Sequence, residues 1–143
     1  MRMNAGAKTW ADISLAALAS VLLATYYGAA IPFTVARSAG LTLAIPSFIL
    51  WATARLQLGK SFSVRPKARR LVTHGLYSKV RNPVYVFSTL WLIGFALAAG
   101  KPWWLLFLLV VVPMQTIRAR REAKVLEAKF GDDYREYRRR TWF

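Results

Sequence analysis

The sequence predicts an all-α fold, an integral membrane bundle of four transmembrane helices. Hydrophobic residues make up 56% of the 143-residue chain and charged residues only 19%, whereas a soluble domain carries about a quarter charged residues. The apolar residues gather in four runs, each near the ~20 residues that a helix needs to cross a ~30 Å hydrocarbon layer. Lys and Arg fall almost entirely between these runs. The composition indicates a single domain, residues 1–143.

The predicted transmembrane segments are residues 13–35, 39–54, 84–99 and 103–117. The last three are slightly short, so they either use their flanking residues or lie in a locally thinned region of the membrane, with Arg55 and Lys101 at their ends able to snorkel toward the interface. Most Trp and Tyr residues lie toward segment ends, as in the aromatic belts of membrane proteins. A soluble bundle with buried helices is the alternative, and it is disfavoured because the runs lack the polar stripe of an amphipathic helix.

The distribution of charge predicts the orientation of the helices. Segment 55–83 carries eight Lys and Arg with no acid, and segment 118–143 carries nine with five acids. The other two connections hold only Arg37 and Lys101. The positive-inside rule therefore places both charged segments and both termini in the cytoplasm, which four crossings satisfy. We expect a prokaryotic inner membrane protein whose N-terminal segment is retained as the start of the first helix.

The net charge of +15 is compatible with two classes of partner, nucleic acid and an anionic membrane surface. Nucleic acid is excluded because a nucleic-acid-binding protein has no use for the long apolar runs. Anionic lipid headgroups are therefore the expected partners. The closing run 134–143, which mixes Arg with Tyr, Trp and Phe, suits such a surface.

A tight turn is predicted at Gly100-Lys101-Pro102, since Gly accepts a positive φ and Pro suits a first helical position. Segments 84–99 and 103–117 should therefore form an antiparallel hairpin. Beyond Ile117 the helical pattern continues as a charged amphipathic helix until Gly131 ends it.

The hairpin makes neighbours of two polar stretches, residues 69–85 and 118–122. Pro83 suits the first turn of a helix, and the N–H groups there favour an anion. Arg118 and Glu122 are four residues apart and face the same way, so a zwitterionic ligand fits between the helix start and Glu122. The alternative is an ordinary helix start beside a solvated ion pair, and spacing alone leaves both possibilities open.

No metal site is expected. The chain has no Cys, and His74 is its single His, so the usual nitrogen and sulfur ligands of zinc are missing. A hydrogen-bonding role, or none, is the expectation for His74.

Several short motifs follow one another in these stretches. They are Leu71-Val72, Gly75-Leu76-Tyr77, Arg81-Asn82-Pro83-Val84-Tyr85, Arg118 with Glu122, and Phe130-Gly131-Asp132-Asp133-Tyr134-Arg135-Glu136-Tyr137. In order and spacing they resemble the isoprenylcysteine carboxyl methyltransferase and phospholipid N-methyltransferase superfamily of membrane enzymes, over roughly residues 60–140. The family pattern is His-x-Leu-Val, Gly-x-Tyr, Arg-His-Pro-x-Tyr, an Arg before a Glu-Glu pair, and Phe-Gly-x-x-Tyr-x-x-Tyr.

Three positions depart from the family pattern. Arg69 replaces the first His, Asn82 replaces the His of Arg-His-Pro, and Ala123 replaces the second Glu. Asn82 still donates and accepts hydrogen bonds, whereas a role that needs an imidazole is in doubt. His74 is a candidate for partial replacement of the lost His.

The resemblance implies a pocket for S-adenosylmethionine, with S-adenosylhomocysteine as product, capped by the cytoplasmic loop and the C-terminal helix. Arg118 matches the substrate-binding position. Arg118 and Glu122 are the expected catalytic residues, Glu122 as base for an amine acceptor and Arg118 as the group that orients a carboxylate. The cofactor-binding residues carried over are Arg70, Leu71, Val72, His74, Gly75, Tyr77, Asn82, Pro83, Val84, Tyr85 and Glu122.

Three functions fit this resemblance. N-methylation of an aminophospholipid or another long-chain amine is favoured, because the chain is minimal and lacks the additional N-terminal helices expected of many protein-lipid methylators. The alternatives are carboxyl methylation of isoprenylcysteine-type substrates and a non-enzymatic membrane module. A membrane lipid or lipid-like substrate is the expected ligand, and the sequence does not indicate the oligomeric state.

Overall fold

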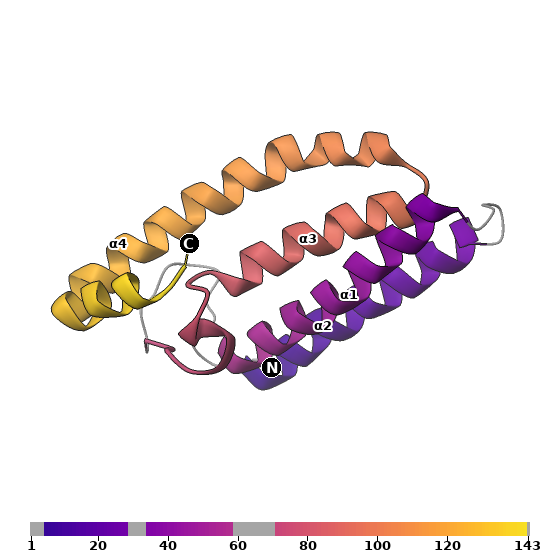
Figure 1. Cartoon of the computed structure of the whole chain (residues 1–143). Helices are drawn as coiled ribbons and strands as arrows, with labels where there is room; N and C mark the ends of the chain where they lie inside the picture. Colours follow the sequence, from indigo (N-terminus) through magenta and orange to yellow (C-terminus); the bar gives the residue numbers. More distant parts are fainter. Residues whose placement is uncertain (1–4, 29–33, 59–70, 143) are drawn as a thin grey trace.

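The computed structural model describes residues 5–28, 34–58 and 71–142. Four α-helices follow one another, α1 (Ala5–Gly28), α2 (Val35–Leu58), α3 (Pro83–Ala98) and α4 (Leu108–Arg140). Two short 3-10 helices, η2 (Gly75–Ser78) and η3 (Pro102–Phe107), precede α3 and α4. The predicted all-α fold is confirmed (Figure 1).

Two helical stretches among the described residues are long and apolar enough to cross a membrane, Val35–Leu58 and Pro102–Arg140. Two further apolar helices, Ala11–Leu23 and Pro83–Ala98, are shorter. Large apolar side chains such as Leu15 and Leu109 are exposed along these helices, which suits contact with lipid rather than water. Length and composition thus support two of the four predicted crossings.

The first helix differs in its bounds from the predicted segment 13–35. It begins at Ala5, because the alanine-rich stretch before residue 13 favours a helix, and it ends at Gly28. Val35 belongs to the next helix, so the predicted end of the first segment was wrong.

The second helix extends past both ends of the predicted segment 39–54. At its start the Oγ1 of Thr34 accepts a hydrogen bond of 3.2 Å from the backbone N–H of Arg37, which is a helix N-cap. Near its other end, Arg55 is not placed to snorkel, although the sequence allowed it. Arg55 is buried and forms an ion pair with Asp12 of α1. This partner compensates the buried charge, and α2 continues to Leu58.

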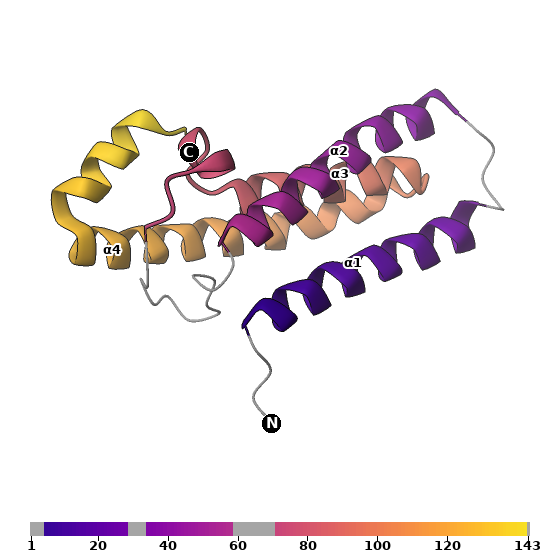
Figure 2. The ribbon, with the colours of Figure 1, turned by 90° about the horizontal axis from the view of Figure 1, so that it is seen from below.

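The most extensive helix contact joins α2 and α3, which lie side by side in Figures 1 and 2. A Cβ on Gly40 would lie 2.4 Å from the backbone nitrogen of Ala98, and a Cβ on Gly94 would lie 2.5 Å from that of Ala44. Each helix therefore presents a Gly and an Ala four residues apart to the other, the small-residue pattern by which membrane helices approach closely.

The turn after α3 forms as predicted. Gly100 has a φ of 62°, and the Lys101 N–H donates a hydrogen bond of 3.0 Å to the Ala96 carbonyl. The predicted segment 84–99 closely matches α3, whereas 103–117 begins as the 3-10 helix η3. Beyond the turn α3 and α4 run antiparallel but contact one another sparsely (Figure 1).

The helix α4 continues beyond Ile117, as predicted. At Gly131 the φ of 51° and ψ of −119° are not helical, so the axis breaks at the predicted residue. The chain then resumes a helix up to Arg140, which the sequence analysis did not predict. This last helical stretch turns back toward the segment that precedes α3 (Figure 2).

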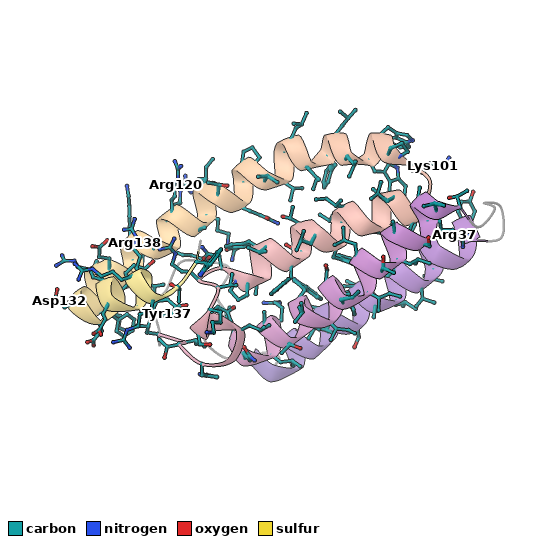
Figure 3. The ribbon with its side chains drawn as sticks, viewed as in Figure 1. Arg37, Lys101, Arg120, Asp132, Tyr137 and Arg138 are labelled. Carbon is teal, nitrogen blue, oxygen red and sulfur yellow. The ribbon has the colours of Figure 1, made fainter. Side chains whose placement is uncertain are left out.

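The basic residues divide between the two ends of the helices. Arg120 and Arg138 lie at the end that also holds η2, together with Tyr137, while Arg37 and Lys101 lie at the opposite end (Figure 3). The two polar stretches predicted to form a site are therefore at one end of the bundle.

Gly94→Leu is expected to destabilise the protein by about 3 kcal/mol or more, because overpacked side chains cost 1–3 kcal/mol and here the obstacle is the backbone of α2. Thermal melting of the purified protein in detergent measures this. Ala39→Leu is the matched control, since Ala39 is exposed on α2. Equal melting temperatures for both variants would show that the crossing is not tightly packed.

Candidate active site

The start of α3 and the middle of α4 meet at three side chains. The Tyr85 hydroxyl donates a hydrogen bond of 2.8 Å to Glu122 Oε1. Arg118 Nε donates to the same oxygen at 3.0 Å, and the Arg118 guanidinium lies 6.0 Å from the centre of the Tyr85 ring. The structure thus brings together three of the predicted site residues from two separate stretches.

The Arg118 and Glu122 pair is part of a contact between two helices. The side chains are 36% and 31% exposed, so as an isolated pair they would add little to stability. Because Glu122 also accepts a hydrogen bond from Tyr85 on α3, its carboxylate is held between two helices. The pair is oriented by the fold and still accessible to a ligand.

Two of the predicted cofactor residues pack inside the protein. Val72 and Tyr77 are buried with Ala54 of α2, and Val84 packs against this cluster. These side chains hold the segment before α3 against α2. Because these side chains are buried, Val72 and Tyr77 would contribute to a cofactor pocket only through their backbone groups and through the shape they give to the segment before α3.

Pro83 and Asn82 begin α3 as the sequence predicted. Pro83 is buried at the first helical position, and the Asn82 carbonyl accepts hydrogen bonds of 3.1 Å from the N–H groups of Tyr85 and Val86. This start sets the direction of the Tyr85 side chain toward α4.

The 3-10 helix η2 is fixed by a residue that the sequence analysis missed. Gln57 Oε1 of α2 accepts a hydrogen bond of 2.9 Å from the Leu76 N–H. Gly75 has a φ of 62°, and a Cβ there would lie 2.3 Å from Gln57 Nε2. The positive φ favours glycine at this position, which gives a structural reason for the Gly-x-Tyr motif, and the end of the Gln57 side chain occupies the space that a Cβ would take.

The C-terminal segment is attached to the segment that leads into α3. The buried Tyr137 hydroxyl donates a hydrogen bond of 2.8 Å to the Tyr77 carbonyl. The Trp142 N–H donates to the Lys79 carbonyl, and the Arg81 N–H donates to the Trp142 carbonyl, both at 2.8 Å. Tyr137 is the last residue of the Phe-Gly-x-x-Tyr-x-x-Tyr motif. The sequence analysis identified this motif but did not predict that Tyr137 attaches the C-terminal segment.

Burial raises the pKa of Tyr137 to about 12, an effect to which Tyr134 adds and which Arg81 opposes. A raised pKa of a phenol means that folding favours the protonated form. The hydroxyl therefore donates its hydrogen bond at every pH below about 10, and this stabilisation is lost as the pH rises toward 12.

The remaining predicted residues lie elsewhere. His74 and Gly75 are exposed at the start of η2, and Leu71 is half-buried. Arg69 and Arg70 lie outside the described residues.

The helical fold, the apolar helices and the polar site at one end define an all-α protein with candidate membrane-spanning helices. A family model described as phospholipid methyltransferase matches residues 35–133, from the start of α2 to just past the break at Gly131. This match covers well over half of the chain. The chain belongs to the phospholipid methyltransferase family.

Two named relatives are similar in sequence. The protein-S-isoprenylcysteine O-methyltransferase of Schizosaccharomyces pombe is 37% identical over 98 residues, which are 64% of this chain and 42% of the relative. The protein-S-isoprenylcysteine O-methyltransferase B of Arabidopsis thaliana is 34% identical over 108 residues, 71% of this chain and 55% of the relative. The chain thus spans about half the length of the relatives it matches, and both relatives are named for O-methylation.

Tyr137→Phe is expected to cost about 1–3 kcal/mol, because the buried Tyr77 carbonyl loses its donor. The larger effect should be local, with faster hydrogen exchange at the Arg81 and Trp142 amides. Hydrogen exchange followed by mass spectrometry measures this. Tyr134→Phe removes a hydroxyl from the neighbouring buried ring and serves as the control. Equal exchange in both variants would contradict a role of Tyr137 in attaching the tail.

Proposed function

We propose that this protein is an S-adenosylmethionine-dependent methyltransferase that methylates the carboxylate of a lipid-like acceptor. The observation that carries the proposal is Arg118, a carboxylate-binding side chain held by Glu122 beside Tyr85. The names of the two relatives support O-methylation. They agree with the alternative of the sequence analysis better than with the favoured N-methylation.

The proposed reaction takes place at the cytoplasmic face of a membrane crossed four times. Support for the crossings comes from α2 and the η3–α4 stretch, with α1 and α3 as shorter apolar helices. The site lies at the end of the bundle that holds Arg120 and Arg138 (Figure 3), the side that the positive-inside rule assigns to the cytoplasm. The prokaryotic inner membrane remains a prediction, and both named relatives are eukaryotic.

The residues at the site fit the chemical groups of S-adenosylmethionine. A carboxylate and an aromatic ring, Glu122 and Tyr85, suit the positively charged groups of the cofactor, whereas Arg118 is assigned to the carboxylate of the acceptor. When bound, this cofactor supplies a methyl group on a positively charged sulfur. The other residues expected to hold it remain a prediction from the family pattern: Arg70, Leu71, Val72, His74, Gly75, Tyr77, Asn82, Pro83 and Val84.

Methyl transfer is an in-line displacement, so the protein has to align the reactants and exclude water. An acceptor carboxylate oxygen forms the new bond to the methyl carbon while the bond from that carbon to sulfur breaks. The electron pair stays on sulfur, and the products are a neutral ester and S-adenosylhomocysteine. No proton has to leave. Arg118 would orient the carboxylate, and Glu122 would hold Arg118 in place.

An amine acceptor is the second candidate, and the partly exposed Glu122 carboxylate favours it. Amine methylation releases a proton, for which Glu122 or a water held by it is the proposed base. The family description as phospholipid methyltransferase supports the same alternative.

Contact with anionic lipid headgroups is proposed for the C-terminal helix. Arg138, Arg139 and Arg140 are exposed next to Trp142, whose ring is also exposed. Each basic residue near an anionic membrane surface is worth about 1 kcal/mol. This attraction would press the C-terminal segment, and with it the site, against the membrane.

The acceptor class is tested by supplying the purified protein with methyl-labelled cofactor and either a farnesylated cysteine or phosphatidylethanolamine. Label on the farnesylated cysteine, at a base-labile ester, is the expected result. Label confined to phosphatidylethanolamine would support amine methylation. Failure to bind S-adenosylhomocysteine would favour a non-enzymatic membrane module.

Glu122→Ala is expected to weaken S-adenosylhomocysteine binding about 10- to 100-fold, because a hydrogen bond to a charged group contributes about 1.5–3 kcal/mol. Calorimetric titration of the protein in lipid nanodiscs measures this affinity. Glu127→Ala is the control, since Glu127 lies on the same helix and pairs with the exposed Arg135. Unchanged affinity in the Glu122 variant would remove it from the cofactor site.

Arg118→Ala is expected to leave S-adenosylhomocysteine affinity within a few-fold of the wild type and to lower turnover of a carboxylate acceptor about 100-fold, a loss of about 3 kcal/mol of charge-assisted hydrogen bonding. Steady-state transfer of labelled methyl to a farnesylated cysteine measures turnover. Arg120→Ala, at an exposed position on the same helix, should behave as the wild type. Normal turnover in the Arg118 variant would discard its substrate role.

A further inference from the structure

Arg55 carries a buried charge that the proposed chemistry does not use. Its side chain is 6% exposed and forms an ion pair with Asp12 of α1, whose side chain is 54% exposed. Among the described residues, Arg55 is the only charged residue that is buried. The helix α1 lies outside residues 35–133, the region that the family model matches. The pair therefore joins an element outside that region to the helix that supports the site.

The position of Arg55 on α2 places it next to the active site. Its neighbour Ala54 packs against Tyr77, and Gln57, two residues further on, binds η2. The charges of Arg55 and Arg118 lie close enough to repel one another. A buried cation therefore lies beside the charged residues of the site.

The charges of Arg55 and Glu122 both act on the Tyr77 phenol. Burial raises the pKa of Tyr77, and the Tyr137 phenol adds to the effect. Glu122 raises this pKa further, whereas Arg55 lowers it. Because the interaction between charges weakens with distance and with solvent screening, Arg55 and Glu122 belong to one neighbourhood. The long Arg55 side chain has the rotamer freedom to turn from one carboxylate to another.

Stability gives little reason for an ion pair at this position. A buried pair can often be replaced by apolar residues without loss, whereas removal of one partner leaves the other charge uncompensated. The helix α1 contacts α2 sparsely, so the pair does not belong to a tightly packed interface. The consequence of losing Asp12 is therefore set by the carboxylate to which Arg55 turns next.

Acidic residues are scarce, and their distribution limits the choice of a new partner. The chain has six, and Asp12 is the one that precedes residue 118. Of the five on α4, three pair with arginines of the same helix: Glu127, Asp132 and Glu136. Glu122 acts on the same phenol as Arg55, so it is the carboxylate to which an uncompensated Arg55 would turn. There it would compete with Arg118 and with a positively charged ligand.

We propose that Asp12 is a positioning residue of the active site: its ion pair holds Arg55 away from Glu122, so that this carboxylate stays available to the ligand. The inference rests on the proposed function, in which Glu122 faces a positively charged group of the cofactor. Asp12 does not touch the ligand, and its effect is transmitted through Arg55. The helix α1 thereby contributes to the site, although the family motifs lie between residues 71 and 137.

The first experiment measures S-adenosylhomocysteine affinity in lipid nanodiscs by calorimetric titration. Asp12→Asn is expected to bind about tenfold more weakly, because the released Arg55 competes for the Glu122 carboxylate. Arg55→Met keeps an unbranched apolar side chain and is expected to stay within about threefold of the wild type. The double variant Asp12→Asn/Arg55→Met is expected to regain this affinity. A merely structural ion pair predicts equal losses in both single variants, because each breaks the same pair.

The second experiment detects the new partner of Arg55 without any ligand. A double-mutant cycle combines Asp12→Asn on α1 with Glu122→Gln on α4 and measures thermal melting in detergent. Glu122→Gln is expected to lower the melting temperature by about 3 °C more in the Asp12→Asn variant than in the wild type. This difference should vanish when Arg55→Met is also present. Glu127→Gln is the control, since Glu127 pairs with Arg135, and it should show no such difference.

Asp12→Ser, which leaves room for water beside the guanidinium, replaces Asp12→Asn if that variant does not fold, with the same results expected. Unchanged affinity in the Asp12 variant, or equal losses in the Asp12 and Arg55 variants, overturns the inference. Additive effects of the Asp12 and Glu122 substitutions on the melting temperature overturn it as well.

The outcome for the proposed function is separate. A wild type that fails to bind S-adenosylhomocysteine contradicts the proposed function, and the double-mutant cycle then still decides where Arg55 turns. A wild type that binds S-adenosylhomocysteine but shows additive substitutions contradicts the positioning role of Asp12 and leaves the function standing.

Discussion

The close crossing of α2 and α3 is the contact on which the rest of the structure depends. Gly40 and Gly94 face the backbone of the opposite helix with no room for a Cβ, so the two helices lie in van der Waals contact along their axes. The contact is stabilised by van der Waals packing rather than by the hydrophobic effect, as expected for helices surrounded by lipid. This pair is the support against which α1, η2 and the segment before α3 are placed.

The position of the site follows from that support through two contacts. Ala54 of α2 packs against Val72 and Tyr77, which fixes the segment that leads into Pro83. The C-terminal helix then returns from Gly131, and Tyr137 bonds the same segment from the other side. The chain before α3 is thereby held between α2 and the tail, and Tyr85 is directed at α4.

The α3–α4 contact differs from the α2–α3 contact because it is made by polar side chains, and this suits a surface that has to bind a ligand. Two of these side chains are long, Glu122 and Gln115, and they bond Tyr85 and Ser88 of α3. A tightly packed crossing like that of α2 and α3 would leave no room for an acceptor. The fold thus combines one rigid helix pair with one adaptable surface, which carries the charged groups at one end and apolar side chains at the other.

The sequence by itself determined the features that depend on local chemistry. Apolar runs predicted the helices, Gly100 and Gly131 predicted a turn and a break because few other residues accept a positive φ, and motif spacing indicated that Arg118 and Glu122 belong together. Only the tertiary structure decided that Arg55 pairs with Asp12, that Gln57 fixes η2 and that Tyr137 reaches Tyr77. These partners are far apart along the chain, and no local pattern encodes a contact that exists only once helices have packed.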